Sequence, residues 1–132
     1  MSTLEIKNLH VALDRKPILN GINLVLPQGK THVIMGPNGS GKSTLGNTIL
    51  RHPQCTISKG TIMFGKNKLS SMKTDEIARA GVLLALQHPQ AVSGVSVTNL
   101  LTIAMRKFSA NKKDFKMAHF RQEIKDTAKA LH

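Results

Sequence analysis

A glycine-rich segment constrains the fold of this chain more than any other feature. Residues 36–43 read Gly-Pro-Asn-Gly-Ser-Gly-Lys-Ser, which fits the pattern G-x-x-x-x-G-K-[ST] at every position. The apolar segment Thr31–Met35 precedes it and predicts a strand, and Ser43–Arg51 follows it with the apolar face of a helix. Because a strand, a glycine-rich loop and a helix come in this order, the segment predicts a phosphate-binding loop.

The chemistry of phosphate binding explains why such a loop needs these residues. Glycines let the backbone turn tightly, so that successive N–H groups point inward at the phosphates. A helix that begins at Lys42 adds the positive end of its dipole to the same spot. Lys42 also brings a positive charge to the β and γ phosphates, and the Ser43 hydroxyl is a ligand for Mg²⁺. The alternative interpretation is an ordinary glycine-rich turn.

Composition sets the class of protein. The chain has 132 residues, 40% of them apolar, which predicts one domain with a core of its own. Nineteen Lys and Arg against seven Asp and Glu give a net charge of +12, which favours an anionic partner. Cys55 is the single cysteine, which excludes an internal disulfide and a cysteine-cluster metal site. With no membrane-length apolar run and no signal sequence, we expect a small, soluble, intracellular protein.

The first two thirds of the chain combine strand and helix patterns. Leu4–Leu9 and Ile22–Leu26 alternate apolar and polar residues, as half-buried strands do, and a turn at Gln28–Gly29 follows the second. Three further elements are expected: a β-rich segment bracketed by glycines at Gly60–Gly65, a short helix at Asp75–Ala80 that stops at Gly81, and a fully buried strand at Val82–Leu86. Strands and helices in this order predict an α/β sheet.

The last third of the chain follows a helical period. One apolar stripe consists of Val97, Leu100, Leu101, Ala104, Met105 and Phe108, and a second of Met117, Phe120, Ile124, Ala128 and Leu131. The first stripe is interpreted as core, with a partner groove as the alternative. Basic residues between Arg106 and Lys129 are interspersed with acids, as on a solvated helix face, so no direct nucleic-acid contact is expected.

The loop, with Asn38 and Thr44 included, resembles the Walker A loop of ABC-type ATPases. Further blocks resemble one branch of that family, SufC, the cytosolic ATPase of the SUF iron–sulfur cluster assembly system. They are Leu4–Val11, His52–Pro53, Asp75–Glu76 with Ala78–Gly81, and Gln87–Pro89 with Gly94–Ser96. The resemblance covers about residues 3–108. It implies a P-loop NTPase fold of the α/β class, as a single partial domain with a β-rich and P-loop portion at 1–96 and a helical segment at 97–132.

The resemblance also implies the site residues. ATP would be bound by Gly36, Pro37, Asn38, Gly39, Ser40, Gly41, Lys42, Ser43 and Thr44. Gln87 falls at the glutamine of the family's Q-loop, where it would contact Mg²⁺ or the attacking water and act with Lys42 in catalysis. Gln90 is the other residue near enough in sequence to take that role. The alternative interpretation of Gln87 is a polar residue that ends a strand and has no role in catalysis. Many relatives stack adenine on an aromatic side chain, but Leu13 stands at that place here.

Several motifs of the family are absent from these 132 residues. No LSGGQ-like signature, no apolar run ending in Asp-Glu and no switch histidine follows the helical segment. Each of the six histidines is interpreted as a surface or loop residue, and Cys55 as a structural bystander. We therefore expect an N-terminal half that binds ATP without hydrolysing it, within an ATPase that acts as a complete dimer.

The resemblance to the SufC branch also implies the partners of this protein. SUF scaffold subunits of the SufB/SufD kind, a nucleotide-dependent dimer and a cytoplasmic location are implied, with no membrane insertion. Three alternatives stay open: the ATP-binding subunit of an ABC membrane transporter, a non-hydrolysing nucleotide-binding fragment, and a basic nucleic-acid binder that rests on charge alone.

Overall fold

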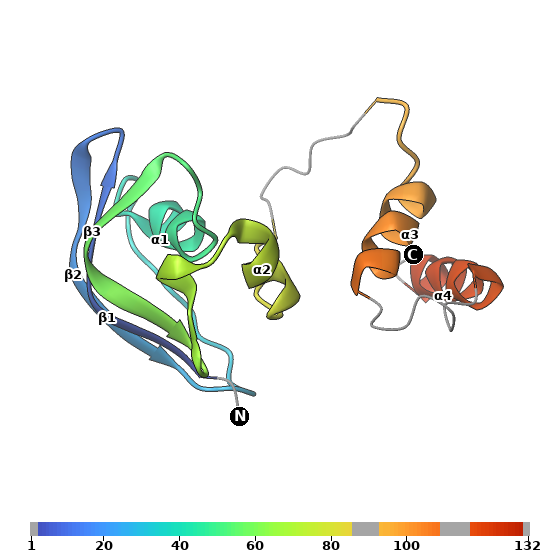
Figure 1. The fold of residues 1–132 in the computed structure, drawn as a ribbon, viewed down its shortest axis with the longest axis horizontal. Coiled ribbons are helices and arrows are strands. Elements are labelled where there is room, and N and C mark those ends of the chain that lie inside the picture. The colour runs from blue at the N-terminus through green and yellow to red at the C-terminus, as the bar shows by residue number, and fades with distance from the viewer. Residues whose placement is uncertain (1–2, 86–92, 109–116, 131–132) are drawn as a thin grey trace. The chain divides into compact units, whose positions relative to one another are not determined.

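The computed structural model describes residues 3–85, 93–108 and 117–130, and the chain forms two compact units, residues 1–85 and 86–132 (Figure 1). In the first unit, four strands form one sheet: β1 (Leu4–Leu13), β2 (Lys16–Leu26), β3 (Cys55–Phe64) and β4 (Asn67–Lys68). Their order is β2-β1-β3-β4, so β1 lies in the interior and pairs antiparallel with both β2 and β3. The strands predicted near the N-terminus and before Pro27 are confirmed, although β1 and β2 are longer than predicted.

A tight hairpin explains the extra length of β1 and β2. Asp14 and Arg15 form a two-residue loop with φ of 47° and 69°, and Leu13 pairs with Lys16 across it. Positive φ at both loop residues is typical of the type I′ turn, whose twist matches that of the strands. Pro17 is tolerated because β2 is the edge strand of the sheet. The loop lacks the glycine that usually signals such a hairpin.

The pairing of β1 with β3 contains an irregularity that requires glycine. Gly60 has a φ of 94°, and a Cβ atom there would lie 2.2 Å from the carbonyl oxygen of Asn8. Asn8 itself has a φ of 45°, and its N–H donates to Oδ1 of Asn23 at 2.9 Å. The β-rich segment predicted at Gly60–Gly65 is confirmed as the second half of β3, but its predicted start at Gly60 is wrong, because β3 begins at Cys55 and runs through this close backbone approach.

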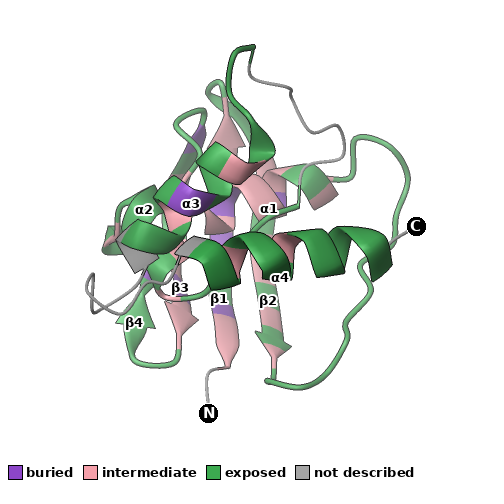
Figure 2. Cartoon of the chain, turned by 90° about the vertical axis from the view of Figure 1, so that its right-hand side faces the viewer, coloured by how far each residue is buried: buried purple, intermediate pink, exposed green. Residues whose placement is uncertain are grey.

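The core of the first unit lies between the sheet and the helices on one of its faces (Figure 1), and Figure 2 marks buried residues along β1. Ile6, Leu9, Ile62, Leu69 and Ile77 are each 0–1% exposed. Burial of an apolar side chain of this size contributes about 1.5–3 kcal/mol. They come from β1, β3, the short 3₁₀ helix η1 (Leu69–Ser71) and helix α2 (Thr74–Arg79). Helix α1 (Lys42–Ile49) contacts β3 and β2 and adds Leu45 to the same cluster.

The helices of the first unit agree with the predicted segments. The predicted helix after the glycine-rich loop is α1, and the predicted helix near residue 75 is α2. At the start of α2, the Lys73 N–H donates to Oε2 of Glu76 at 2.7 Å, which satisfies a backbone donor that the helix leaves open. Asp75 and Arg79 form an ion pair one turn apart, and Gly81 follows the helix with a φ of 96°.

Two predicted strands are not found. The segment at 31–35, just before the loop, carries no regular structure and belongs to no strand of the described sheet, and Val33 is 73% exposed. Residues 82–85 carry no regular structure, and Leu83 is 88% exposed rather than fully buried; Leu86 lies outside the described residues. Apolar composition favours a strand only when another strand pairs with it, and the described residues supply none here.

The second unit contains helices α3 (Val97–Phe108) and α4 (Met117–Ala130), both as predicted. Ser96 caps α3, since its Oγ accepts the N–H of Asn99 at 3.2 Å. The stripe interpreted as core is not buried in the described part of this unit: Val97 is 68% and Leu100 55% exposed. α3 packs against α4, and one neighbouring helix covers only part of so wide an apolar arc. No helix among the described residues is long and apolar enough to cross a membrane.

Candidate phosphate-binding site

The glycine-rich loop connects residues 31–35 to α1, and every residue from 31 to 40 is exposed to solvent. Gly39 has a φ of 82° and Gly41 a φ of 92°, values that residues with a Cβ rarely adopt. Within the loop, the Ser40 N–H donates to the carbonyl of Pro37 at 3.3 Å. Of the predicted strand, loop and helix, the loop and the helix are found, whereas residues 31–35 carry no regular structure.

β2 positions the C-terminal end of the loop. Gly41 is the N-cap of α1, in the left-handed conformation. A Cβ atom on Gly41 would lie 2.7 Å from Cδ2 of Leu19 and 3.4 Å from Cγ2 of Ile18. The loop backbone therefore rests directly on the side chains of an edge strand, and a larger residue at position 41 would push the loop away from the sheet.

Helix α1 presents its N-terminus to the loop. The Leu45 N–H donates to the carbonyl of Gly41 at 2.9 Å, so the N–H groups of Lys42, Ser43 and Thr44 have no acceptor in the preceding turn. The buried side of the helix carries Leu45 and Thr48, which is 1% exposed. The Thr48 hydroxyl donates to the Thr44 carbonyl at 2.6 Å. A fixed helix with open N–H groups is suited to bind an anion.

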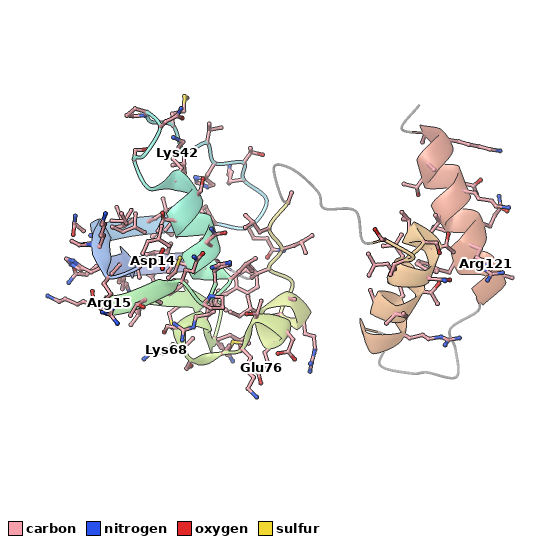
Figure 3. The ribbon with its side chains drawn as sticks, turned by 90° about the horizontal axis from the view of Figure 1, so that it is seen from above. Asp14, Arg15, Lys42, Lys68, Glu76 and Arg121 are labelled. Atoms are coloured by element: carbon pink, nitrogen blue, oxygen red, sulfur yellow. The ribbon has the colours of Figure 1, made fainter. Side chains whose placement is uncertain are left out.

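Lys42 places its charge at the same end of the helix (Figure 3). Its Nζ donates to the carbonyl oxygens of Gly36 at 2.7 Å and Pro37 at 2.8 Å, and lies 3.5 Å from Oγ of Ser40. The ammonium group therefore lies against the turn of the loop, and the backbone of Lys42 belongs to the first turn of α1. Among residues 3–85, this arrangement joins a cation, a glycine-rich turn and a helix N-terminus.

Ser43 is the described residue that fits a magnesium ligand. Its hydroxyl is exposed in the first turn of α1, and hydroxyl oxygen is a hard donor of the kind that Mg²⁺ prefers. The described residues contain no group of three or more His, Cys, Asp or Glu that would hold a metal ion without phosphate. Gln87 and its competitor Gln90 lie outside the described residues, so the metal and water roles predicted for Gln87 stay predictions.

Sequence reasoning missed an apolar pocket beside the loop. It has a volume of about 260 Å³. Its lining consists of Leu19, Ile22, Asn23 and Leu24 of β2, Ile34 and Met35 before the loop, and Ser40, Gly41, Lys42 and Leu45. Alternation along β2 places Ile22 and Leu24 on one face, but it does not predict Leu19, because the register with β1 shifts between the partners of Ile22 and Leu19. Leu13 is not part of this pocket: it lies at the end of β1, opposite Cys55, and packs against the core.

Curated relatives share a large part of the sequence. Vegetative protein 296 of Bacillus subtilis is 45% identical over 79% of this chain and 40% of its own length. A protein of Streptococcus pyogenes described as a probable ABC transporter ATP-binding protein is 38% identical over 91% of this chain and 47% of its own length. A probable ATP-dependent transporter, ycf16, of Pyropia yezoensis is 44% identical over 80% and 43%, respectively. The chain spans less than half the length of these relatives.

The fold agrees with that of a solved ABC protein. A bacterial Atm1-family ABC exporter with ATP bound matches 60% of this chain and 14% of its own with a TM-score of 0.54 and 24% identity, a likeness that concerns the fold. The sequence pattern of the family described as ABC transporter matches residues 19–131, which include the glycine-rich loop and α1. Because this match extends over most of the chain, the protein belongs to the ABC transporter ATP-binding family, with the fold of a P-loop NTPase nucleotide-binding domain.

Proposed function

We propose that residues 36–44 bind the phosphates of MgATP. The observation that carries this proposal is the junction of the glycine-rich loop with α1, where Lys42 and the open N–H groups of the first turn lie together. Backbone N–H groups and the helix dipole would hold the phosphate oxygens, and the Lys42 ammonium would neutralise the charge of the β and γ phosphates. Membership of the ABC family supports the same ligand.

Each of the loop residues has a different role in the proposed binding of MgATP. Gly39 and Gly41 let the backbone adopt positive φ, which brings the N–H groups to one side of the turn. Ser43 would hold Mg²⁺, an ion that neutralises charge between the phosphates when it is bound. Lys42 orients the phosphate chain, and the packing of Gly41 on Leu19 fixes the distance of the loop from the sheet.

The proposal is tested by measuring whether the chain binds the phosphates of the nucleotide or its base. Calorimetry of the chain with MgATP, inorganic tripolyphosphate and adenosine separates the contribution of the phosphates from that of the base. We expect binding of MgATP and of tripolyphosphate, and no measurable binding of adenosine at the same concentration. Binding of adenosine alone would mean that an apolar surface, rather than the loop, recognises the ligand.

We also propose that this chain binds ATP but does not turn it over by itself. Hydrolysis needs a group that orients and polarises water, and donors that stabilise charge on the γ-phosphate oxygens. In the family that the loop resembles, these are the acid after the Walker B strand and the signature motif of an opposing subunit, and neither is present in the 132 residues.

For the cellular role, we propose that the protein supports iron–sulfur cluster assembly in the cytoplasm, with SufB/SufD-like scaffold subunits as partners and a nucleotide-dependent dimer as the active form. The support is the sequence blocks, among them Leu4–Val11 and Gln87–Pro89. The second candidate is the ATP-binding subunit of a membrane transporter, a role that the names of the relatives from Streptococcus and Pyropia favour.

Affinity capture from the native cell distinguishes the two roles. A tagged chain that serves cluster assembly should retain soluble scaffold subunits of the SufB/SufD kind. A transporter subunit should retain an integral membrane protein, and only after detergent extraction. Recovery of the membrane protein without scaffold subunits would replace the first role by the second.

A further inference from the structure

The face of the sheet that points away from the core is rich in basic side chains. Side chains alternate between the two faces of a strand, so the neighbours of the buried Ile6, Leu9 and Ile62 lie on this outer face. The outer face consists of Glu5, Lys7 and His10 of β1, Asn23 and Val25 of β2, Lys59, Thr61 and Met63 of β3, and Lys68 of β4.

The strand register brings these bases together. His10 of β1 pairs with Lys59 of β3, and Lys7 pairs with Thr61, two positions further along β3. Directly opposed residues on one face have their Cβ atoms about 4.5–5.5 Å apart. Lys7, His10 and Lys59 are therefore neighbours on the outer face, although they come from two strands far apart in sequence.

Little of the positive charge on the outer face is neutralised by the protein itself. Glu5 is the acid among the residues of this face, and it pairs with Lys7 at 2.9 Å. The ammonium groups of Lys59 and Lys68 have no carboxylate within 4 Å among the described residues. Neighbouring bases with few acids between them create a positive potential, which attracts an anionic partner.

The charge of the other residues shows where the partner of this face must come from. Leu45 of α1, Leu69 of η1 and Ile77 of α2 belong to the core cluster, so these helices pack on the opposite face of the sheet (Figure 1). Residues 86–132 contain eight Lys and Arg against three Asp and Glu, and the whole chain has a net charge of +12. Neither the second unit nor a second copy of the chain complements the outer face, so the complementary charge belongs to another molecule.

We propose that the outer face is a docking surface for an acidic polypeptide, that is, a segment of a partner protein rich in Asp and Glu. Glu5 and its pairing partner Val25, which is 54% exposed, distinguish this partner from a bilayer or a nucleic acid. A carboxylate repels a uniformly anionic surface, whereas a polypeptide combines carboxylates with apolar side chains and amide groups, as protein interfaces do. The proposal does not depend on nucleotide binding at the glycine-rich loop.

Charge reversal on the outer face tests the proposal. A fluorescent peptide of repeated Glu-Glu-Val units is titrated with the full chain and its binding followed by anisotropy at about 0.15 M salt, where distant charges are screened. Lys59→Glu/Lys68→Glu should weaken binding by about tenfold or more, because it places carboxylates against those of the peptide. Lys30→Glu/Lys129→Glu is the matched control, since both lysines are exposed, neither belongs to a strand, and the change in net charge is the same.

The control variant should bind the peptide nearly as well as the wild type does. Equal losses in the two double variants would mean that the peptide responds to net charge and not to this face, which would overturn the proposal. Single-stranded DNA and vesicles containing phosphatidylglycerol are titrated in parallel. If these probes lose affinity in Lys59→Glu/Lys68→Glu while the peptide does not, the face binds phosphate groups and not an acidic polypeptide.

Nuclear magnetic resonance of the wild-type chain gives a test that does not depend on how the variants fold. Addition of the Glu-Glu-Val peptide should shift the backbone amide signals of Lys7, His10 and Lys59, and leave those of Leu45 and Ile77 in place. Shifts confined to the glycine-rich loop or to α4, or no shift at a peptide concentration of about 1 mM, would overturn the proposal. Failure of the chain to bind MgATP would contradict the proposed function and leave the docking surface unaffected.

Discussion

The strands of the antiparallel sheet and the segments at 31–35 and 82–85 are all rich in apolar residues, but they differ in how far those residues are buried. In the sheet, Ile6 and Ile62 face each other across β1 and β3 and are almost completely buried. Val33, Met35 and Leu83 are 73%, 85% and 88% exposed, respectively. The difference is not in hydrophobicity but in the presence of a pairing strand. Antiparallel partners are supplied locally by hairpins, whereas a parallel strand needs a neighbour brought from further along the chain.

The same difference separates two parts of the candidate site: the part held by the antiparallel sheet and the part that a parallel strand would carry. The glycine-rich loop rests on β2 through Gly41 and Leu19, so the part of the candidate site that needs only local structure is present. Groups that a neighbouring parallel strand would carry have no counterpart among the described residues. Each of the following experiments tests whether that division holds.

The largest expected effect is on turnover. Loss of a catalytic base lowers a rate by about 10²–10⁴, and loss of transition-state donors costs a similar factor. Gln87 does not replace the base, because an amide does not accept a proton near neutral pH. Phosphate release by the purified chain should therefore not exceed that of its Lys42→Ala variant, which serves as the control for contaminating ATPases. Turnover near one per second that depends on Lys42 would show that the site is complete without a further strand.

The second prediction concerns the two kinds of apolar residue. Ile62→Ala should lower the free energy of unfolding by about 2–5 kcal/mol, because Ile62 is 0% exposed and its removal leaves a cavity under the sheet. Val33→Ala should change it by less than about 0.5 kcal/mol, as is usual for exposed positions. Urea unfolding followed by circular dichroism gives both values. Equal losses in the two variants would mean that residues 31–35 are packed in solution.

Sequence patterns predicted those parts of the fold whose partners lie nearby. Alternation located β1 and β2, and helical periodicity located α1, α3 and α4. The hairpin at Asp14–Arg15 was missed because neither residue is glycine, although both adopt positive φ. Gly60 was taken for a strand end because a glycine within a strand is visible only when the neighbouring backbone at Asn8 is known.

The candidate site was predictable to a different extent. The glycines, Lys42 and Ser43 follow from a motif whose spacing reflects phosphate geometry, and the loop lies where the motif places it. The contacts of Lys42 with the Gly36 and Pro37 carbonyls were not predictable, because they depend on loop backbone angles. The same holds for the packing of Gly41 on Leu19, which joins residues far apart in sequence.

The third prediction is that Lys42→Ala removes measurable nucleotide binding. Charge-assisted hydrogen bonds are worth roughly 1.5–3 kcal/mol each, and the variant loses the charge next to the β and γ phosphates. Calorimetry with MgATP should show a loss of more than tenfold, with Lys30→Ala as a control that keeps the net charge of the variant. Binding within threefold of the wild type would contradict the assignment of the loop.

The fourth prediction concerns selection of the base. Leu13 offers an apolar contact but no aromatic face, so MgATP should be preferred over MgGTP by no more than about tenfold, or about 1.4 kcal/mol. Competition between the two nucleotides for the chain measures the ratio. A preference above a hundredfold would mean that another residue contacts the adenine. The site would then include residues outside β1 and β2.

The smallest change in stability, and the sharpest test of the comparison, is expected for Val33→Lys. Exposed apolar strand-like segments without a partner promote association between chains, and a lysine is a device by which proteins block such pairing. The free energy of unfolding should stay within about 0.5 kcal/mol of the wild type, because Val33 is 73% exposed. The onset of aggregation, followed by light scattering at increasing protein concentration, should move to higher concentration. Lys30→Val is the matched reverse change at an exposed position just before the segment, and it should move the onset the other way. If Val33→Lys instead unfolds the chain, residues 31–35 are buried against a partner strand in solution, and the contrast between the sheet and this segment disappears.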